Sequence, residues 1–358
     1  MNGELDWVSP ITAIRRRPTS KSSTAALSAT GLEARRQPKR EGDLAGLCHS
    51  LMRVLVLLNP RSRALRRAPA GPLGAQIADR FKALAVVAEI SVVSGREIGV
   101  TVRRAAASRG ADGERQFDIV VVCGGDGTIS AASSVLAGGD LPLGILPLGN
   151  FNHFARDLGI PLELDPAIEI IARKHVASVD VGEVNGRVFV NNSSLGIYPH
   201  LVAERDRHRR YGLARWTAAA LACCRVLWRL PQPQVRAFAS GWTSEKRTPC
   251  VFVGNNMYEL DMFAIAKRSR LDQGKLCLYI ANPQGRLALM RLAVRAFLGR
   301  LEPEADVTPA CLESLEIWTR RRRLAVALDG EAMVFRTPLH YRIRPRALRI
   351  IIPEPATL

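Results

Sequence analysis

Long apolar runs are missing from this chain of 358 residues. No uninterrupted apolar stretch approaches the roughly 20 residues that a helix needs to span a bilayer. The first residues also lack the apolar core of a secretory signal. These absences argue against a membrane-spanning protein, so we expect either a soluble protein or one that sits on a membrane surface.

The chain also lacks the signatures of several enzyme classes. It has no GxxxxGK followed by Ser or Thr, which argues against a P-loop enzyme. It has no HRD or DFG sequence, which argues against a protein kinase. No GxGxxG opens the first predicted helix, so a dinucleotide-dependent oxidoreductase loses its usual signature. Paired CxxC and HExxH sequences are absent, and with them the common zinc sites.

Cysteine is scarce and shows no framework spacing. The seven cysteines are an odd number, so a set of intramolecular disulfides has no support from the count. We therefore expect reduced thiols and a cytoplasmic location.

Positive charge is what the chain has in excess. The formal net charge is +18 and the isoelectric point is near 10.5. A protein of this charge is expected to meet an anionic partner. Charge alone leaves nucleic acid, an anionic lipid surface and a phosphorylated small molecule open.

The apolar pattern divides the chain into three parts. Residues 1–51 are rich in Arg, Ser, Thr, Pro and Ala without a sustained period, so we expect a disordered basic tail. Residues 52–178 alternate strands with helices, which predicts right-handed crossovers and a mainly parallel sheet. Residues 179–339 contain short strands with polar turns, which favours an antiparallel second domain. Helical inserts are expected at 203–230 and 286–299.

The expected elements of the two domains are as follows. In the first domain, strands cover residues 53–58, 87–93, 117–123 and 142–146, and helices cover 72–85, 98–108, 129–137 and 151–157. In the second domain, strands cover residues 179–184, 187–192, 235–239, 249–254, 275–281, 313–319 and 323–328.

The run Cys123-Gly124-Gly125-Asp126-Gly127-Thr128 is the most informative motif. It lies between the apolar segment Phe117–Val122 and the small-residue stretch Ile129–Ala137, so it predicts a strand, a glycine loop and a helix start. Such a loop directs backbone N–H groups and the positive end of a helix dipole at one point. The Asp126 carboxylate would repel phosphate unless it holds a metal, a bridging hydrogen bond or a catalytic proton. An ordinary tight turn is the alternative.

Two further strand-to-helix junctions repeat this arrangement. Leu55–Leu58 leads into Asn59-Pro60-Arg61-Ser62-Arg63, and Leu143–Leu146 leads into Pro147-Leu148-Gly149-Asn150-Phe151-Asn152. In an open α/β sheet, ligands collect beyond the carboxyl ends of the strands. The three loops together predict a cradle for a polyphosphate, although each alone is compatible with a turn or a helix cap.

These motifs resemble those of the diacylglycerol kinase catalytic family, which includes sphingosine kinases and bacterial lipid kinases. Asn59-Pro60, Gly124–Thr128, Pro147–Asn152 and Asp329-Gly330-Glu331 occur in the order of that family, and the resemblance extends from about residue 52 to 353. It implies ATP-dependent phosphorylation of a lipid hydroxyl with Mg²⁺. It also implies an α/β nucleotide-binding domain followed by a β-sandwich, with a last strand near 340–354 returning to the first domain.

The loops and the resemblance together give the candidate nucleotide-binding residues. They are Asn59, Pro60, Arg61, Ser62, Arg63, Ser94, Gly124, Gly125, Asp126, Gly127, Thr128, Gly149, Asn150 and Asn152. Candidate metal ligands are Asp126 and Asp272.

The chain departs from the family pattern at four positions. After the second predicted strand, Gly95 stands where the family's Thr-x-x-x-Gly has threonine, and Ser94 is the nearest hydroxyl. Arg63 stands where the first loop normally has glycine, and Asn150 replaces a threonine, so a hydroxyl is lost there. Gln273 occurs where the family places an aspartate near a structural magnesium, which puts that second metal site in doubt.

Asp329-Gly330-Glu331 lies between the apolar runs Leu324–Leu328 and Met333–Phe335, and Asp-Gly in that setting is a strong hairpin signal. A hairpin without further function is one interpretation. By resemblance, Asp329 is the candidate general base, and Glu331 supports it or the Mg²⁺ shell. Asp126 is the rival base, and both are kept.

A membrane-facing surface explains the charge most simply. In the insert, Arg215, Arg225 and Arg229 fall on one side of a helix that also carries Trp216 and Trp228, which suits an interfacial helix on anionic headgroups. A helix that only caps the sandwich is the alternative. We expect a location on the inner face of the membrane.

The leading hypothesis is a peripheral lipid kinase. A soluble-substrate kinase resembling NAD kinase is second, and a non-catalytic nucleotide-binding or anionic-surface module is third. Specific nucleic-acid binding ranks last, because no recognition motif accompanies the charge. A homodimer is kept as an alternative to a monomer.

Overall fold

The computed structural model describes residues 51–62, 65, 69–110, 113–200, 202, 234–239, 241–261, 264–282, 288, 291 and 307–354. The predicted tail, apart from Leu51, and nearly all of both helical inserts therefore lie outside the described residues. None of the helices in the described part of the chain combines the length and the apolarity of a membrane-spanning segment.

Four parallel strands form the first part of the larger sheet. They are, in spatial order, β2 (Val87–Val92), β1 (Arg53–Leu58), β3 (Ile119–Gly124) and β4 (Leu143–Pro147). Strands β1, β3 and β4 are almost completely buried, as expected for apolar runs covered on both faces. The parallel sheet predicted for the first domain is confirmed.

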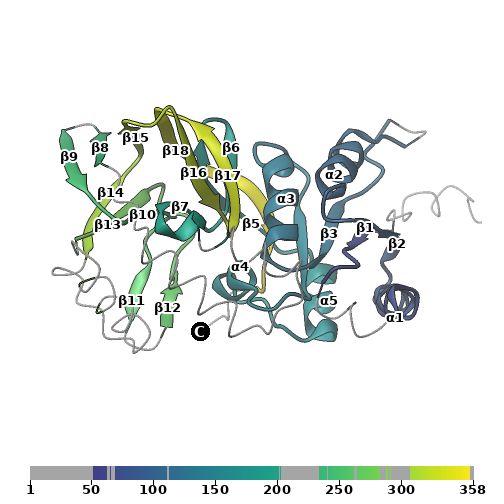
Figure 1. Cartoon of the computed structure of the whole chain (residues 1–358). Coiled ribbons are helices and arrows are strands. Elements are labelled where there is room, and N and C mark those ends of the chain that lie inside the picture. The colour runs from purple at the N-terminus through teal and green to yellow at the C-terminus, as the bar shows by residue number, and fades with distance from the viewer. Residues whose placement is uncertain are drawn as a thin grey trace, which may run out of the picture. The chain divides into compact units, whose positions relative to one another are not determined.

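Helices cover both faces of these strands (Figure 1). They are α1 (Ala70–Ala83), α2 (Ile98–Ala107), α3 (Asp126–Leu136), α4 (His153–Asp157) and α5 (Leu164–Arg173). Helix α2 packs beside α3, and α1 packs beside α5. Helix α3 begins three residues earlier than expected, so Asp126 belongs to its first turn; Gly125 is the N-cap and its carbonyl accepts from the amide of Ile129.

The larger sheet continues into the second half of the chain. Its remaining members are β5 (Val176–Val184), β6 (Arg187–Phe189), β8 (Gln234–Ala239), β9 (Trp242–Arg247), β15 (Ser314–Thr319) and β18 (Leu339–Ile351). Strand β18 pairs with β4 in parallel through Ile350 and Leu143, and it is antiparallel to β5 and β15. The sheet therefore joins the two halves through their backbones.

A second sheet is entirely antiparallel among the described residues. Its order is β14 (Val307–Leu312), β13 (Leu276–Ala281), β10 (Cys250–Asn255), β7 (Asn192–Gly196), β16 (Arg323–Leu328) and β17 (Glu331–Arg336), and a separate pair joins β11 (Glu259–Asp261) to β12 (Ala264–Lys267). An apolar core lies between this sheet and the antiparallel part of the larger one, which gives a sandwich. The predicted antiparallel second domain is confirmed.

The cysteine expectation is corrected for one pair. Cys277 and Cys311 form a disulfide between β13 and β14, where the two residues stand directly opposite each other. They are 34 positions apart in sequence, and only the strand register brings them together. Among the described residues, Cys123 and Cys250 are free thiols, and burial raises the pKa of both.

Candidate active site

The first loop is tied to the glycine loop by one side chain. Asn59 donates from Nδ2 to Thr128 Oγ1 at 2.8 Å, and its backbone N–H donates to the Cys123 carbonyl at 3.1 Å. Its Oδ1 accepts from the amide of Arg61 at 3.0 Å. Asn59 thus fixes the first loop against the helix start that carries the glycine motif.

Other residues of the first and second loops lie around Asn59. Pro60 and Arg61 are exposed, whereas Ser62 is buried and its Oγ finds no hydrogen-bond partner in the described part of the chain. A Cβ atom added at Gly95 would lie 3.4 Å from Asn59 Nδ2, so the loop of Ser94 adjoins the first loop. The Ser94 hydroxyl donates to Glu97 Oε2 at 2.7 Å. Arg63 lies outside the described residues.

The glycine loop and the loop after β4 touch through their backbones. A Cβ atom built on Gly149 would lie 2.4 Å from Gly125 Cα, so only glycine fits at this contact. Asn152, which adopts a left-handed conformation with φ of 51°, accepts from the Gly149 amide and donates to the Pro147 carbonyl. The Asn152 side chain therefore bridges Pro147 and Gly149 and stabilises the conformation of the loop. Asn150 is exposed beside it.

Asp126 stands at the positive end of α3. Its Oδ1 accepts from the backbone amide of Phe154 at 3.3 Å, which links α3 to the start of α4. The free N–H groups of a helix start and the helix dipole together favour an anion at this position. The predicted loops at Asn59, Gly124–Thr128 and Gly149 are therefore brought to one place.

The acidic hairpin of the second half reaches the same place. Asp329 and Gly330 form the turn between β16 and β17 with φ of 46° and 82°. A Cβ atom added at Gly127 would lie 3.1 Å from Glu331 Oε1, so the Glu331 carboxylate lies against the glycine loop. The predicted hairpin is confirmed, and its tip is directed at the candidate nucleotide site.

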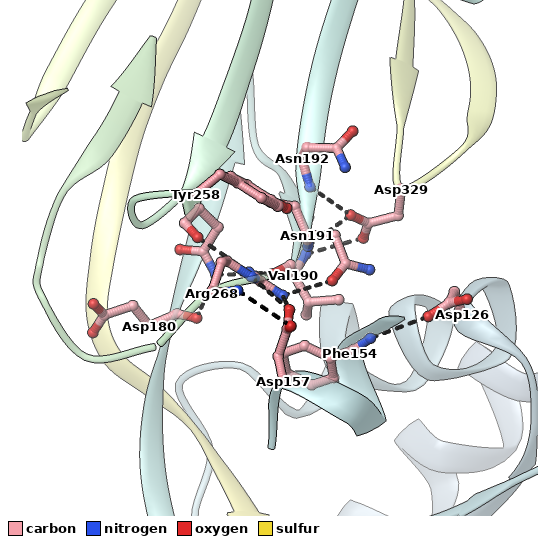
Figure 2. A network of polar contacts seen from close by, with 11 residues as sticks. Asp126, Phe154, Asp157, Asp180, Val190, Asn191, Asn192, Tyr258, Arg268 and Asp329 are labelled. Atoms are coloured by element: carbon pink, nitrogen blue, oxygen red, sulfur yellow. Dashed lines mark hydrogen bonds and ion pairs between the residues drawn. The ribbon is translucent and has the colours of Figure 1, made fainter. Parts of the chain in front are cut away.

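The Asp329 carboxylate is held by four donors, and Figure 2 shows its contacts with Val190, Asn191 and Asn192. Oδ1 accepts from the amides of Asn191 and Asn192 at 2.8 and 3.1 Å, and Oδ2 accepts from the Val190 amide at 2.9 Å. The Ser130 hydroxyl of α3 donates to Oδ2 at 2.6 Å. Burial raises the pKa of Asp329, while these hydrogen bonds act in the opposite direction. A carboxylate has about four lone-pair positions, so all of them have a donor.

Mg²⁺ fits the carboxylates at the glycine loop. Within the described residues, His, Cys, Asp and Glu side chains form no group of three or more that could hold a metal ion by themselves. Mg²⁺ in phosphoryl-transfer sites typically uses one or two carboxylates together with substrate phosphates, and Asp126 and Glu331 supply that donor set. Asp272, the other candidate metal ligand, is instead paired with Arg270 at 3.0 Å, and the hydrogen bond from Arg270 lowers the pKa of Asp272.

Sequence reasoning missed several residues that surround this site. Ser130, Asn191 and Arg268 lie in no motif, and Asp157 lies in the family-like stretch Gly149–Pro161 but had no role assigned to it. The structure connects Asp157, Asn191 and Arg268 to Asp126 or Asp329 (Figure 2), and Ser130 donates to Asp329. The only available signal was the Asp-Gly turn, which predicted where the acidic pair lies and nothing about its partners.

Comparison with known proteins matches two family domains to the chain. The diacylglycerol kinase catalytic domain matches residues 53–184, and the YegS C-terminal NAD kinase beta sandwich-like domain matches residues 201–352. A probable lipid kinase YegS-like from Pseudomonas aeruginosa is 29% identical over 68% of this chain and 79% of that protein. Lipid kinase YegS from Escherichia coli is 26% identical over 73% of this chain and 87% of that protein.

A solved structure supports the fold. A putative diacylglycerol kinase from Bacillus anthracis superimposes with a TM-score of 0.65 and 22% sequence identity, over 86% of this chain and 96% of that one. The chain therefore belongs to the diacylglycerol kinase catalytic-domain family, with a YegS-type C-terminal domain as its second half.

Proposed function

We propose that this protein is an ATP-dependent lipid kinase that transfers the γ-phosphoryl group to the hydroxyl of a lipid, either diacylglycerol or a sphingoid-like acceptor. The observation that supports the proposal most is the meeting of loops from both halves. The glycine loop of α3 and the acidic hairpin of β16 and β17 approach within contact distance at Gly127 and Glu331. The relatives with matching domains are kinases, which supports a phosphotransferase with ATP as the donor.

Different residues have different roles in the proposed reaction. Backbone amides at Gly124–Thr128 and the α3 dipole stabilise charge that develops on the transferred phosphoryl group. Asn59 holds the first loop in place beside them. Mg²⁺, held by Asp126 and Glu331, would neutralise phosphate charge when it is bound.

Asp329 is the proposed proton acceptor, and Asp126 is the rival. Of the four donors on Asp329, only the Ser130 hydroxyl can rotate away without moving the backbone. An acceptor hydroxyl could take its place at Oδ2. Burial, which raises the pKa of Asp329, makes the carboxylate a stronger base than an exposed one.

We also propose that the lipid is presented on an anionic membrane surface, because the net charge is +18. This would place the protein at the inner face of a membrane.

The experiment combines purified protein, γ-labelled ATP and Mg²⁺ with vesicles that contain diacylglycerol or sphingosine. Neutral and anionic vesicles are compared, and a parallel reaction contains NAD in place of lipid. We expect label in the lipid phase, with more product on anionic vesicles than on neutral ones. Label in NAD alone would favour the soluble-substrate kinase, and ATP binding without transfer to any acceptor would favour a non-catalytic module.

The Asp126→Asn variant tests the site in the same assay. Loss of this carboxylate should lower transfer on the order of 10²- to 10³-fold, the range found when one transition-state contact is removed. Asp79→Asn, which removes an exposed carboxylate on α1, is the matched control. Parental turnover in Asp126→Asn would contradict the assigned role.

A further inference from the structure

A buried guanidinium lies behind the candidate site. Arg268 is 1% exposed, and its partner Asp157, at the end of α4, has a side chain that is 4% exposed. Arg268 Nε donates to Asp157 Oδ2 at 2.8 Å, and Nη2 lies 2.8 Å from the same oxygen. The ion pair joins Arg268, which directly follows β12, to the end of α4 in the α/β half (Figure 2).

The rest of the guanidinium contacts the segment 190–192, which joins β6 to β7. Nη1 donates to the Val190 carbonyl at 2.7 Å, and Nη2 donates to Asn191 Oδ1 at 2.7 Å. Nη1 also donates to the Asn255 carbonyl at 3.1 Å. The rings of Phe154 and Tyr258 face the guanidinium, and their centroids lie 5.8 and 5.3 Å from its central carbon.

The segment 190–192 therefore lies between two opposite charges. Arg268 binds its carbonyl and side-chain oxygens, while Asp329 accepts hydrogen bonds from all three of its amides. Hydrogen bonds in such a chain polarise one another when they are shielded from water. The orientation of the Asp329 carboxylate depends on these amides, and the amides depend on Arg268.

Both ends of this chain of contacts return to the nucleotide loops. Asp157 closes α4, whose second residue, Phe154, donates its amide to Asp126; Ser130, in the second turn of α3, donates to Asp329. Asp126 and Asp329 are thus joined by two routes, one through α3 and one through Arg268. Figure 2 shows the second route along its whole length.

We propose that Arg268 is a positioning residue for phosphoryl transfer, which fixes Asp329 relative to Asp126 through the segment 190–192. This inference rests on the proposed function. Arg268 is enclosed by protein, so it would act through its neighbours and not by direct contact with nucleotide or acceptor. Buried ion pairs give little net stability compared with apolar residues of the same size, so stability alone is a weak reason for a guanidinium whose donors reach four separate residues.

Two variants separate positioning from stability. Arg268→Lys keeps the charge beside Asp157, but an ammonium group has no planar fork to reach Val190 and Asn191 together. The double variant Arg268→Met with Asp157→Asn removes both buried charges and restores neutrality. Arg80→Lys, in an exposed arginine–aspartate pair between α1 and α5, is the matched control.

Four quantities are measured for these variants and for Arg268→Met alone: kcat, KM for ATP, the thermal midpoint, and amide hydrogen exchange of residues 190–192 without substrate. Arg268→Lys should lose about 100-fold in kcat, the cost typical of misplacing a group by about 1 Å, with KM for ATP little changed. The double variant should melt above Arg268→Met alone and yet remain as slow as Arg268→Lys. In both variants, the amides of 190–192 should exchange faster than in the parental protein.

The outcomes are distinguishable from those of the proposed function. An inactive parental protein overturns the proposed function, and this inference with it. If the parental protein is active and either Arg268→Lys or the double variant keeps the parental kcat, the role of Arg268 is overturned and the proposed function stands. A slow Arg268→Lys whose 190–192 amides stay protected overturns the route through that segment. An unaffected Arg80→Lys is required in every case.

Discussion

At the residue scale, the site depends on how one carboxylate is held. Asp329 has a backbone conformation that few non-glycine residues adopt, with φ of 46°, and three amides converge on it. Asp126 could be predicted from the sequence because it lies inside a glycine motif after an apolar strand. Arg268 could not, since it is one of 51 Lys and Arg residues and its partner Asp157 is 111 positions away.

A single hydroxyl tests whether Asp329 is the base. The hydrogen bond from Ser130 lowers the pKa of Asp329 against the stronger effect of burial. In Ser130→Ala the pKa of Asp329 should therefore rise further. Transfer that requires the ionised carboxylate is lost as pH falls through this pKa, so the acidic limb of the kcat/KM profile should move to higher pH.

The measurement is a pH series of lipid phosphorylation for Ser130→Ala and for Ser134→Ala, an exposed serine on the same helix. Ser134→Ala should keep the parental profile. An acidic limb that stays in place in Ser130→Ala would contradict Asp329 as the base.

At the element scale, buried strands and glycine junctions were the predictable parts. Strands β1, β3 and β4 are apolar runs buried on both faces, and the sequence predicts each of them to within two residues. Helix α5 and strands β7, β9, β11, β12 and β14 were missed. Strands β9 and β14 lie at sheet edges, where charged residues and even Pro309 are tolerated, so their patterns lack clear alternation.

The contact between two glycine loops gives a prediction at this scale. Gly149→Ala would place a Cβ atom 2.4 Å from Gly125 Cα and 2.5 Å from Asn152 Oδ1, so the loops must separate. We expect ATP affinity to fall at least about ten-fold, which corresponds to a loss of about 1.4 kcal/mol. Isothermal titration calorimetry with ATP and Mg²⁺ measures it.

The control for this prediction is Gly71→Ala at the start of α1, where an added Cβ atom meets nothing within 4 Å. It should bind ATP like the parental protein. Parental affinity in Gly149→Ala would mean that the two loops do not share one nucleotide.

At the scale of the whole molecule, the two halves share one sheet. Strand β18 pairs with β4, β5 and β15, so a strand from the end of the chain completes the sheet that carries the glycine loop. The resemblance implied this return, but the register is a long-range property that local patterns do not contain. The same holds for the disulfide between Cys277 and Cys311, which spacing alone did not predict.

The central claim is that main-chain amides at several strand ends converge on one triphosphate, opposite an acidic hairpin. A crystal structure with a non-hydrolysable ATP analogue and Mg²⁺ tests it most directly. The account predicts phosphates on the amides of Gly124–Thr128, beside Asn59, with Mg²⁺ on Asp126 and Glu331. A triphosphate bound elsewhere, or protein side chains filling the space before α3, would contradict it.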